Sequence, residues 1–307
     1  MEVRVSVEGL HVLVTGATGF LGSHLIRALR AAGYEVSILK RSSSDCSRIA
    51  PLLSELAVFD LDRDRVEAPF RQRRGIDAII HAATLYGRQN ERSGELLEAN
   101  VAFPLNLLEI GLLHGTPLFI NTDSFIHKGA GDYAYLQSYA LTKKQFVEWG
   151  RLLSRGQPIR FVNVRLEHLY GPFDSGTKFA SQVIRACLNN EPELRLTAGE
   201  QRRDFIYVED AVQAYIRLLQ PAAGAGFAEY ELGTGRSMTI RTFVELVKEE
   251  TCSKTVLNFG ALPYRSNEIM QSEADIGPLQ ALGWSWSFDV RAGIRHLLER
   301  EYGRCHP

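Results

Sequence analysis

The sequence has 307 residues, of which 45% are hydrophobic and 23% charged, and its formal net charge is -1 at pH 7. This length and composition are typical of a soluble globular chain with one large domain or two modest ones. A near-zero charge provides no basic field to draw the protein onto nucleic acid or anionic lipid, so a small-molecule partner is expected.

The four cysteines, Cys46, Cys187, Cys252 and Cys305, are far apart and form no C-x-x-C pair. Their spacing argues against a disulfide framework and against a zinc site, and no metal is expected. The N-terminal segment alternates polar and apolar residues, unlike a signal peptide, and no run of eighteen apolar residues predicts a membrane span. A cytoplasmic location without membrane association is therefore expected.

The first segment with a clear pattern, "HVLVTGATGFLGSHLIRALRAAGYEVSILK", predicts a strand, a helix and a second strand. The apolar run at 12–14 indicates a buried strand, and leucines then recur at helical spacing until Gly33 provides a left-handed stop. The second strand is expected over 35–39. This order is that of a βαβ unit.

The turn between that strand and helix has glycines at positions 16, 19 and 22, in the spacing G-x-x-G-x-x-G. Glycine lets the backbone turn sharply and approach a pyrophosphate, whose charge then lies on the N–H groups of the helix start. A glycine triplet alone is weak evidence, but its place between a strand and a helix predicts a dinucleotide site. The cofactor contacts expected in this turn are Gly16, Thr18, Gly19, Phe20 and Leu21.

The end of the second strand indicates which dinucleotide is preferred. An NAD site usually has an acidic residue here, but this sequence has Lys40, Arg41 and Ser42. A guanidinium with nearby hydroxyls suits the 2′-phosphate of NADP, which is therefore favoured. NAD remains possible, because both cations could face solvent and Asp45 could fold back to serve as the acid.

Further strands follow in chain order. "FDLDRD" (59–64) ends the third, where Asp60 and Leu61 are candidate cofactor contacts. The fourth, 78–81, leads into Ala82 and Ala83, whose small side chains allow the cofactor to approach the carboxyl edge of the sheet. The fifth, within 116–125, precedes a helix, and "IRFVNVRLEHLYGP" then adds a sixth strand. Strand and helix thus alternate through the first half.

A set of motifs in fixed order resembles the extended short-chain dehydrogenase/reductase family, the nucleotide-sugar epimerases, dehydratases and reductases. The resemblance covers essentially the whole chain. The motifs are T-G-A-T-G-F-L-G (15–22), H-A-A (81–83), Y-A-L-T-K (139–143), "RDFIYVEDA" (203–211), "ELGTGRSMTI" (231–240) and "LGW" (282–284).

The resemblance implies an α/β fold: a doubly wound, mostly parallel seven-stranded Rossmann sheet with a smaller C-terminal substrate lobe. We expect the NAD(P)-binding domain over 1–168 plus about 203–235, and the sugar-nucleotide-binding lobe over 169–202 and 236–307. A homodimer built on helices of the first domain is implied by the resemblance only. Phe146 and Trp149 are consistent with such a contact, but burial within one chain would explain them equally well.

Tyr139 and Lys143 are candidates for catalysis and for contact with the cofactor. Positions i and i+4 share one helix face, and a lysine charge near the phenol is expected to lower its pKa. The resemblance implies that Tyr139 exchanges a proton with the substrate while hydride moves to or from the nicotinamide, and that Lys143 orients the nicotinamide ribose. Thr122 matches the third catalytic hydroxyl of the family.

The residues after Thr122 help to separate the subfamilies. Sugar-nucleotide dehydratases resemble T-D-E here, with the two carboxylates as acid and base, whereas this sequence has Asp123 and Ser124. Without the glutamate there is no base for the C5 proton, so dehydration is disfavoured and hydride transfer is not. Asp123 is expected either to contact substrate or to cap the turn. Ser124 and Thr84 are further substrate candidates.

The chain departs from the family pattern near the expected substrate site. The usual R-x-x-N-x-Y-G-P, whose asparagine holds the substrate phosphate, is replaced by "RLEHLYGP". His168 can still donate a hydrogen bond, and it would add charge toward a diphosphate if protonated, although a lone histidine is more often structural. Arg203 and Arg265 occupy positions where the family places phosphate-binding arginines, and Lys178 and Phe179 are weaker candidates for the phosphate and the base.

Within the family, "INTDSF" and "LPYRSNEIM" resemble the CDP-abequose synthase type of reductase, which reduces the 4-keto group of a CDP-linked 3,6-dideoxy sugar. The leading hypothesis is an NADPH-dependent reductase of a nucleotide-linked 4-keto-6-deoxyhexose. The second is a sugar-nucleotide epimerase with retained NAD. The third, from another class, is a non-catalytic NADP-binding regulator, which the Tyr and Lys pair disfavours.

Overall fold

The computed structural model describes residues 9–71, 75–128, 135–221 and 224–303. The chain divides into two compact units. The first unit comprises Met1–Ser124, Leu136–Arg165 and Val212–Tyr230, and the second comprises Phe125–Tyr135, Leu166–Ala211 and Glu231–Pro307. The segment of about 203–235 was expected to return to the nucleotide-binding domain. Only Val212–Tyr230 of this segment belongs to the first unit, so the segment is divided between the two units.

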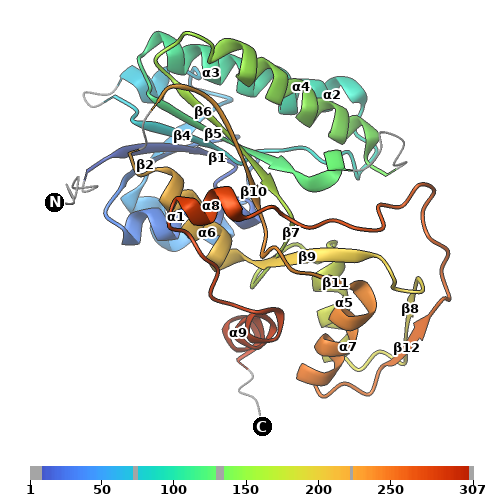
Figure 1. The fold of residues 1–307 in the computed structure, drawn as a ribbon. Helices are drawn as coiled ribbons and strands as arrows, with labels where there is room; N and C mark the ends of the chain where they lie inside the picture. The colour runs from blue at the N-terminus through green and yellow to red at the C-terminus, as the bar shows by residue number, and fades with distance from the viewer. Residues whose placement is uncertain (1–8, 72–74, 129–134, 222–223, 304–307) are drawn as a thin grey trace. The chain divides into compact units, whose positions relative to one another are not determined.

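Within the described residues, the first unit is built on a seven-stranded sheet of order β10-β6-β5-β4-β1-β2-β3 (Figure 1). The five strands from β3 to β5 pair in parallel, which confirms the predicted doubly wound α/β class. The strands are β1 His11–Thr15, β2 Glu35–Lys40, β3 Ala57–Asp60, β4 Ala78–His81, β5 Leu118–Ser124, β6 Arg160–Leu166 and β10 Gly226–Leu232.

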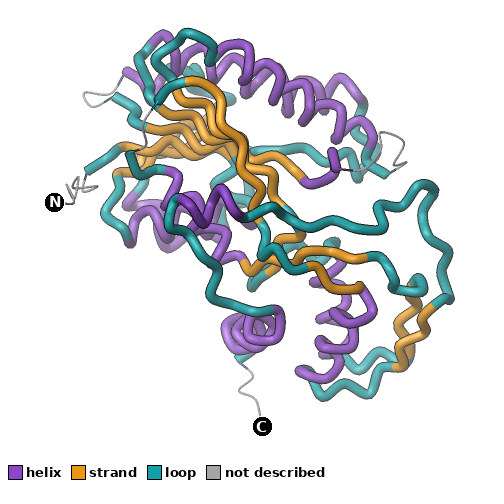
Figure 2. The backbone as a smooth tube through the Cα atoms, in the orientation of Figure 1, coloured by secondary structure: helices purple, strands orange, loops and turns teal. Residues whose placement is uncertain are grey.

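Helices cover both faces of this sheet, with α3 and α4 along one face and α1 on the other (Figures 1 and 2). Strands buried on both faces are mostly apolar, and all five residues of β1 are buried. The two polar residues at its ends have hydrogen-bond partners, since His11 contacts the Ser37 hydroxyl at 2.7 Å and Thr15 contacts His81 Nδ1 at 2.8 Å. The helical segments of the first unit are α1 Phe20–Ala31, η1 Ser47–Glu55, η2 Ala68–Arg71, α2 Ser93–Leu97, η3 Glu98–Ala102, α3 Phe103–Leu113, α4 Gln137–Leu153 and most of α6 Val208–Leu218.

Helix α1 ends where the sequence predicts. Gly33 has φ +84°, a left-handed conformation that glycine adopts without strain. The Gly33 N–H donates to Arg30 O, and the Tyr34 N–H donates to Leu29 O, each at 3.0 Å. These bonds satisfy carbonyls at the helix end and turn the chain into β2.

One continuous helical stretch, Ser93–Leu113, contains 21 residues and is long and apolar enough to cross a membrane by length and composition alone. A core helix of a globular protein meets the same test. Leu107, Leu108 and Ile110 from this stretch belong to the hydrophobic core of the first unit. We therefore interpret the stretch as a core helix.

The second unit has two small sheets, β11-β9-β7 and β12-β8, and a core of its own. That core combines aliphatic side chains with a group of aromatic rings, and Phe205 and Phe243 stack with their centroids 4.1 Å apart. The strands are β7 His168–Tyr170, β8 Glu193–Leu196, β9 Arg202–Tyr207, β11 Ser237–Thr239 and β12 Val256–Phe259. The helices are η4 Phe125–Lys128, α5 Phe179–Leu188, α7 Ile240–Glu250, α8 Gly277–Ala281 and α9 Val290–Tyr302.

A buried carboxylate explains part of the "RDFIYVEDA" motif. Asp204 is fully buried and accepts hydrogen bonds from the backbone N–H groups of Thr234, Gly235 and Ala274 at 2.8, 2.9 and 3.2 Å. Thr234 also donates its hydroxyl to Asp204 at 2.6 Å. One carboxylate thus fixes two loops that are distant in sequence, a structural role.

Candidate active site

The glycine turn after β1 has the backbone geometry that a bound pyrophosphate requires. Gly16 has φ +70°, and a Cβ there would lie 2.5 Å from the nitrogen of Ala83, two residues after β4. A Cβ on Gly22 would lie 2.1 Å from Gly16 O. Side chains are therefore excluded at both positions, and the turn lies against the residues after β4.

The start of α1 fits a dinucleotide. The Gly19 N–H donates to Gly16 O at 2.9 Å, and Gly19 caps α1 without a side chain. This fully described helix has no acidic residue in its first turn that would oppose an anion. Exposed N–H groups and the helix dipole favour a pyrophosphate here. Gly16, Thr18, Gly19, Phe20 and Leu21 all lie in this turn or helix start.

The basic edge beyond β2 also contains a carboxylate. Lys40 Nζ lies 3.4 Å from Asp60 Oδ2, and the Ser42 hydroxyl donates to the same oxygen at 2.8 Å. Asp45, the alternative acid, instead accepts hydrogen bonds from the Ser47 N–H at 2.9 Å and the Ser47 hydroxyl at 3.0 Å. The predicted contacts Lys40, Ser42 and Asp60 thus lie together, and Lys40 is partly neutralised by Asp60.

Tyr139 lies on α4 and is 5% exposed. Its phenol forms hydrogen bonds with the side chains of Ser124 and Thr84, and its ring lies 5.0 Å from that of Tyr86. Burial, followed by the charges of Tyr86 and Asp123, raises the pKa of Tyr139 well above its ordinary value. The expectation of a phenol made acidic by its lysine neighbour is therefore wrong in this structure, because burial is the largest influence on the pKa of Tyr139 and raises it.

Lys143 lies one helical turn after Tyr139 and is 3% exposed. Its Nζ donates to the Thr122 carbonyl at 2.8 Å and lies 6.0 Å from the centroid of the Tyr139 ring. Burial lowers the pKa of Lys143 to about 8, and the nearby charge of Asp123 partly offsets this effect. The i, i+4 spacing thus brings both side chains to one site, as predicted.

The three residues at the end of β5 make different contacts. The Thr122 hydroxyl lies 2.8 Å from that of Tyr215 on α6. Asp123 is buried and accepts a hydrogen bond from Asn163 Nδ2 at 3.1 Å. Ser124 contacts the phenol of Tyr139. The sequence did not indicate this role of Asp123, whose buried carboxylate is bound by Asn163 of β6. The charge of Asp123 also acts on Tyr139 and Lys143.

Asn100 positions Thr84 and was not predicted. Its Oδ1 accepts from the Thr84 hydroxyl at 3.2 Å and the Leu85 N–H at 2.8 Å, and its Nδ2 donates to the Leu85 carbonyl at 2.8 Å. Asn100 lies in the π-helical segment η3, a geometry often found at functional sites. No sequence pattern that we used marks such a segment.

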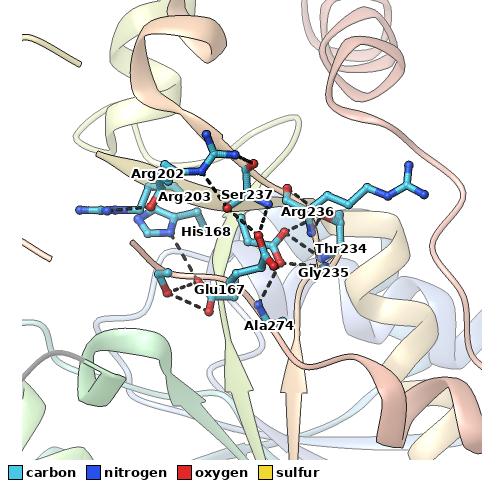
Figure 3. Close-up of polar contacts among 12 residues, drawn as sticks. Glu167, His168, Arg202, Arg203, Thr234, Gly235, Arg236, Ser237 and Ala274 are labelled. Carbon is cyan, nitrogen blue, oxygen red and sulfur yellow. Dashed lines mark hydrogen bonds and ion pairs between the residues drawn. The ribbon is translucent and has the colours of Figure 1, made fainter. Parts of the chain in front are cut away.

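The second unit brings several predicted substrate residues near one another. His168 begins β7, and the positive charges of Arg203 on β9 and Lys178 at the start of α5 both act on its ring. Arg203 forms an ion pair with Glu268 at 2.5 Å, and neither side chain is more than 9% exposed. Figure 3 shows His168, Arg203 and the neighbouring Glu167. Sequence reasoning did not single out either glutamate.

Two further predicted residues have contacts with aromatic rings. The Arg265 guanidinium lies 3.9 Å from the centroid of the Tyr135 ring, a cation–π contact. Phe179, the first residue of α5, is 36% exposed, and its ring lies 6.2 Å from that of Phe243.

A parallel sheet with a glycine turn suited to a dinucleotide, together with a buried Tyr and Lys pair on one helix face, defines an oxidoreductase of the short-chain dehydrogenase/reductase class. The model of the NAD dependent epimerase/dehydratase family matches residues 12–233. The chain belongs to this family of nucleotide-sugar-modifying enzymes and is an NAD(P)-dependent oxidoreductase.

Curated relatives and solved structures agree with this assignment. The chain is 38% identical over 288 residues to a CDP-abequose synthase of Salmonella muenchen, which covers 94% of this chain and 96% of that protein. It is 36% identical over 302 residues to a CDP-abequose synthase of Salmonella typhimurium, with 94% and 98% covered. The structure of MoeE5 in complex with UDP-glucuronic acid and NAD has a TM-score of 0.80 at 26% identity and covers 94% of this chain and 98% of that one.

Proposed function

We propose that this protein is an NADPH-dependent reductase of a nucleotide-diphosphate-linked 4-keto-6-deoxyhexose, with a CDP-linked 3,6-dideoxy sugar as the favoured substrate. The observation that carries the proposal is the geometry of the buried pair on α4: Lys143 Nζ lies 6.0 Å from the centroid of the Tyr139 ring and donates to the Thr122 carbonyl at the end of β5. A phenol held beside an ammonium can give its proton to a carbonyl oxygen that is becoming a hydroxyl. The similarity to two CDP-abequose synthases supports the CDP-linked substrate.

The residues of the first unit have complementary roles in the proposed reduction. When bound, the nicotinamide supplies the hydride that reaches C4. Tyr139 donates its proton to the C4 oxygen, and Ser124 and Thr84 hold the phenol in place. The phenolate left behind is stabilised by the charge of Lys143 and regains its proton from solvent.

Thr122 is the proposed polarising hydroxyl, because it matches the catalytic hydroxyl of the family. Tyr215 can donate its hydrogen to Thr122, since either oxygen of that pair can be the donor. The Thr122 hydrogen is then available for the carbonyl of the substrate. Serine at position 124 leaves no carboxylate to remove the C5 proton, which favours reduction over dehydration.

We assign the nucleotide diphosphate to residues of the second unit. Arg203 and Arg265 provide guanidinium groups for phosphate oxygens, and His168 replaces the asparagine of the family motif. Lys178 is a further cation, and it is paired with Asp174 at 3.1 Å. Phe179 is the proposed contact for the base, since its ring is exposed.

The preference for NADPH rests on Lys40, Arg41 and Ser42 at the end of β2. Arg41 is exposed, and a guanidinium beside a serine hydroxyl suits a 2′-phosphate. NAD is the alternative, because the Asp60 carboxylate lies at the same edge and MoeE5 binds NAD. We also propose a cytoplasmic homodimer.

The second candidate function is a sugar-nucleotide epimerase with retained NAD. It is favoured by the similarity to epimerases, including a putative UDP-glucose 4-epimerase of Methanocaldococcus jannaschii at 24% identity. An epimerase would use the same Tyr139 and Lys143 pair. A non-catalytic regulator would have no use for a buried lysine beside a buried phenol, because burying these groups is costly.

The test is a coenzyme-oxidation assay with CDP-, dTDP-, GDP- and UDP-linked 4-keto-6-deoxy sugars, each with NADPH and with NADH. We expect turnover with a CDP-linked ketone and a higher kcat/KM for NADPH. Absence of turnover with every ketone, together with interconversion of unmodified UDP-sugars and no net coenzyme consumption, would replace the reductase by the epimerase. Absence of both reactions would contradict both functions.

A further inference from the structure

His168 has one polar ring atom that is directed into the protein. The ring lies against that of Phe125, with centroids 4.2 Å apart, and 26% of the side chain is exposed. Its Nδ1, in contrast, is buried and has no hydrogen-bond partner among the described residues. A buried imidazole nitrogen without a partner is costly, so this atom needs an explanation.

Glu167 places a carboxylate next to that nitrogen. Its side chain is fully buried, and its Oε2 lies 3.9 Å from His168 Nδ1 (Figure 3). The hydroxyl of Ser272 lies 2.9 Å from Oε1 and 2.7 Å from Oε2, which holds the carboxylate in position. A protonated imidazole would place a positive charge 3.9 Å from this buried carboxylate, an interaction that favours the charged ring.

The other charges that face His168 come from separate elements and oppose protonation. They are the guanidinium of Arg203 on β9 and the ammonium of Lys178 at the start of α5, which have Glu268 and Asp174 as ion-pair partners. Burial, then Arg203 and then Lys178, lower the pKa of His168 well below its ordinary value. In this structure the ring is therefore neutral at neutral pH.

We infer that Glu167 is a positioning residue through which His168 takes up a proton when the diphosphate of the substrate binds. The inference rests on the proposed function, because it requires an anionic nucleotide at this site. On binding, the neutral ring gains one proton from solvent. The Nδ1–H then faces the Glu167 carboxylate, and the Nε2–H donates to a phosphate oxygen. The proton returns to solvent when the product leaves, and no covalent bond changes.

The ligand reverses the electrostatic balance at the ring. The two negative charges of a doubly esterified diphosphate offset Arg203 and Lys178, so the two cations that oppose protonation no longer do so. The negative charge of the Glu167 carboxylate, 3.9 Å from Nδ1, then favours the protonated ring. The asparagine of the family motif donates a hydrogen bond but cannot titrate. In this protein the affinity for the nucleotide sugar is therefore linked to pH.

The sign of the linkage follows from the direction of the change. The pKa of His168 is low in the free protein and higher in the complex, so binding takes up protons and is stronger at lower pH. We expect the affinity to fall about tenfold between about pH 6 and pH 8.

The test is calorimetric titration of the full chain with CDP-glucose, and with UDP-glucose as a second probe, in buffers of different ionisation enthalpy. The diphosphate of these probes does not titrate near neutrality, so uptake reports on the protein. We expect wild-type uptake of about half a proton per site at neutral pH, which corresponds to the tenfold change in affinity over two pH units. Glu167→Gln should reduce the uptake. His168→Asn should abolish it and flatten the dependence of affinity on pH.

The matched control is His296→Asn. His296 Nδ1 also lies near a carboxylate, 3.8 Å from Glu209 Oε1, elsewhere in the second unit. Uptake should be unchanged in this variant. Thermal unfolding of each variant verifies folding, and if Glu167→Gln does not fold, the His168→Asn result alone decides.

Each outcome has a distinct meaning. Binding without proton uptake, or uptake that survives in His168→Asn, overturns the role of His168 and Glu167 and leaves the proposed function intact. Failure of both probes to bind overturns this inference and the proposed function together. Uptake that is lost in His168→Asn and reduced in Glu167→Gln supports the inference.

Discussion

The hydroxyls around Tyr139 show what a sequence motif can and cannot specify at the scale of single residues. The family resemblance assigns a hydroxyl to position 122, but it does not say what holds it. In the structure Thr122 is held by Tyr215, a fully buried tyrosine 93 positions away. Alternation along β5 directs Thr122 and Asp123 to opposite faces of the sheet, so they have different partners. Such long-range partners are invisible in local spacing.

The contact between Thr122 and Tyr215 predicts that Tyr215, which is remote from the motif in sequence, affects the rate of the reaction. Tyr215→Phe removes the hydroxyl that contacts and orients Thr122, and we expect kcat to fall about tenfold with little change in KM. Thr122→Val removes the polarising hydroxyl itself and should lower kcat about 10²- to 10³-fold. Steady-state kinetics with the ketone substrate would measure both effects.

Tyr34→Phe is the matched control for Tyr215→Phe. Tyr34 is also a buried tyrosine, and its hydroxyl accepts a hydrogen bond from Gln220 at 3.4 Å. We expect the kcat of the Tyr34→Phe enzyme to match that of the wild type. A Tyr215→Phe enzyme with wild-type kcat would refute the orienting role.

The electrostatics of the Tyr139 and Lys143 pair could not be predicted from their spacing. The helical pattern places the two side chains on one face, as observed. The direction of the Tyr139 pKa depends instead on burial and on Tyr86 and Asp123, which come from other segments of the chain. The sequence therefore indicated the pair but gave the wrong direction for the pKa of the phenol.

Lys143 predicts the high-pH behaviour of the enzyme. Its pKa is lowered to about 8, so the ammonium is charged below that pH and loses its charge as the pH rises through it. Because kcat/KM reports on groups of the free enzyme, it should decline above about pH 8. Lys143→Arg keeps a permanent charge and should lose this decline, although its maximum rate will be lower. A wild-type kcat/KM that stays constant to about pH 9.5 would contradict this assignment.

At the scale of elements, the glycine turn was predicted well because its determinants are local. Strand, turn and helix follow one another within residues 11–31, and the close contacts of Gly22 are with its own turn. The division of the segment 203–235 between the two units was not predicted. That division depends on which residues of each unit pack together, and no local pattern specifies it.

Two glycine-to-alanine substitutions should have opposite effects on stability, one next to the glycine turn and one in α2. Gly22→Ala places a Cβ 2.1 Å from the Gly16 carbonyl oxygen, a backbone atom that cannot move without opening the turn. We expect the free energy of unfolding to fall by about 1–3 kcal/mol. The Cβ added by Gly94→Ala in α2 has no atom within 4 Å, and this substitution should raise the free energy of unfolding by about 0.5 kcal/mol. Urea unfolding of the two variants measures both changes, and equal effects would show that the turn is not closely packed.

The same turn should be needed for the cofactor. In Gly22→Ala the displaced helix start should weaken NADPH binding, whereas Gly94→Ala should bind as wild type does. Nucleotide fluorescence titration would measure this difference.

At the scale of the whole molecule, the surface of α4 bears on the proposed homodimer. Leu141, Trp149 and Leu152 are 56%, 42% and 52% exposed, and their spacing places them on one face of the helix. Phe146, which the sequence left open, is 1% exposed and belongs to the core of the first unit. Trp149 therefore remains a candidate for a contact between subunits, and Phe146 does not.

We predict that Leu141→Glu combined with Leu152→Glu converts a dimer into a monomer, because burying two carboxylates in an apolar interface is costly. Light scattering coupled to gel filtration would measure the mass. Leu262→Glu, at a 42% exposed leucine of the second unit, is the control and should leave the mass unchanged. A wild-type protein that is monomeric at all concentrations would contradict the dimer.

The central claim for the molecule is that the protonated phenol of Tyr139 completes a net reduction at C4. The most direct measurement is the transfer of deuterium from NADPH labelled at the reactive position of the nicotinamide to a CDP-linked 4-keto sugar. We predict a product that carries the deuterium at C4, formed with an equal amount of NADP, and a rate lowered about 10²- to 10⁴-fold in Tyr139→Phe. A product without label, formed without net NADPH consumption, or an unchanged rate in Tyr139→Phe would contradict the account.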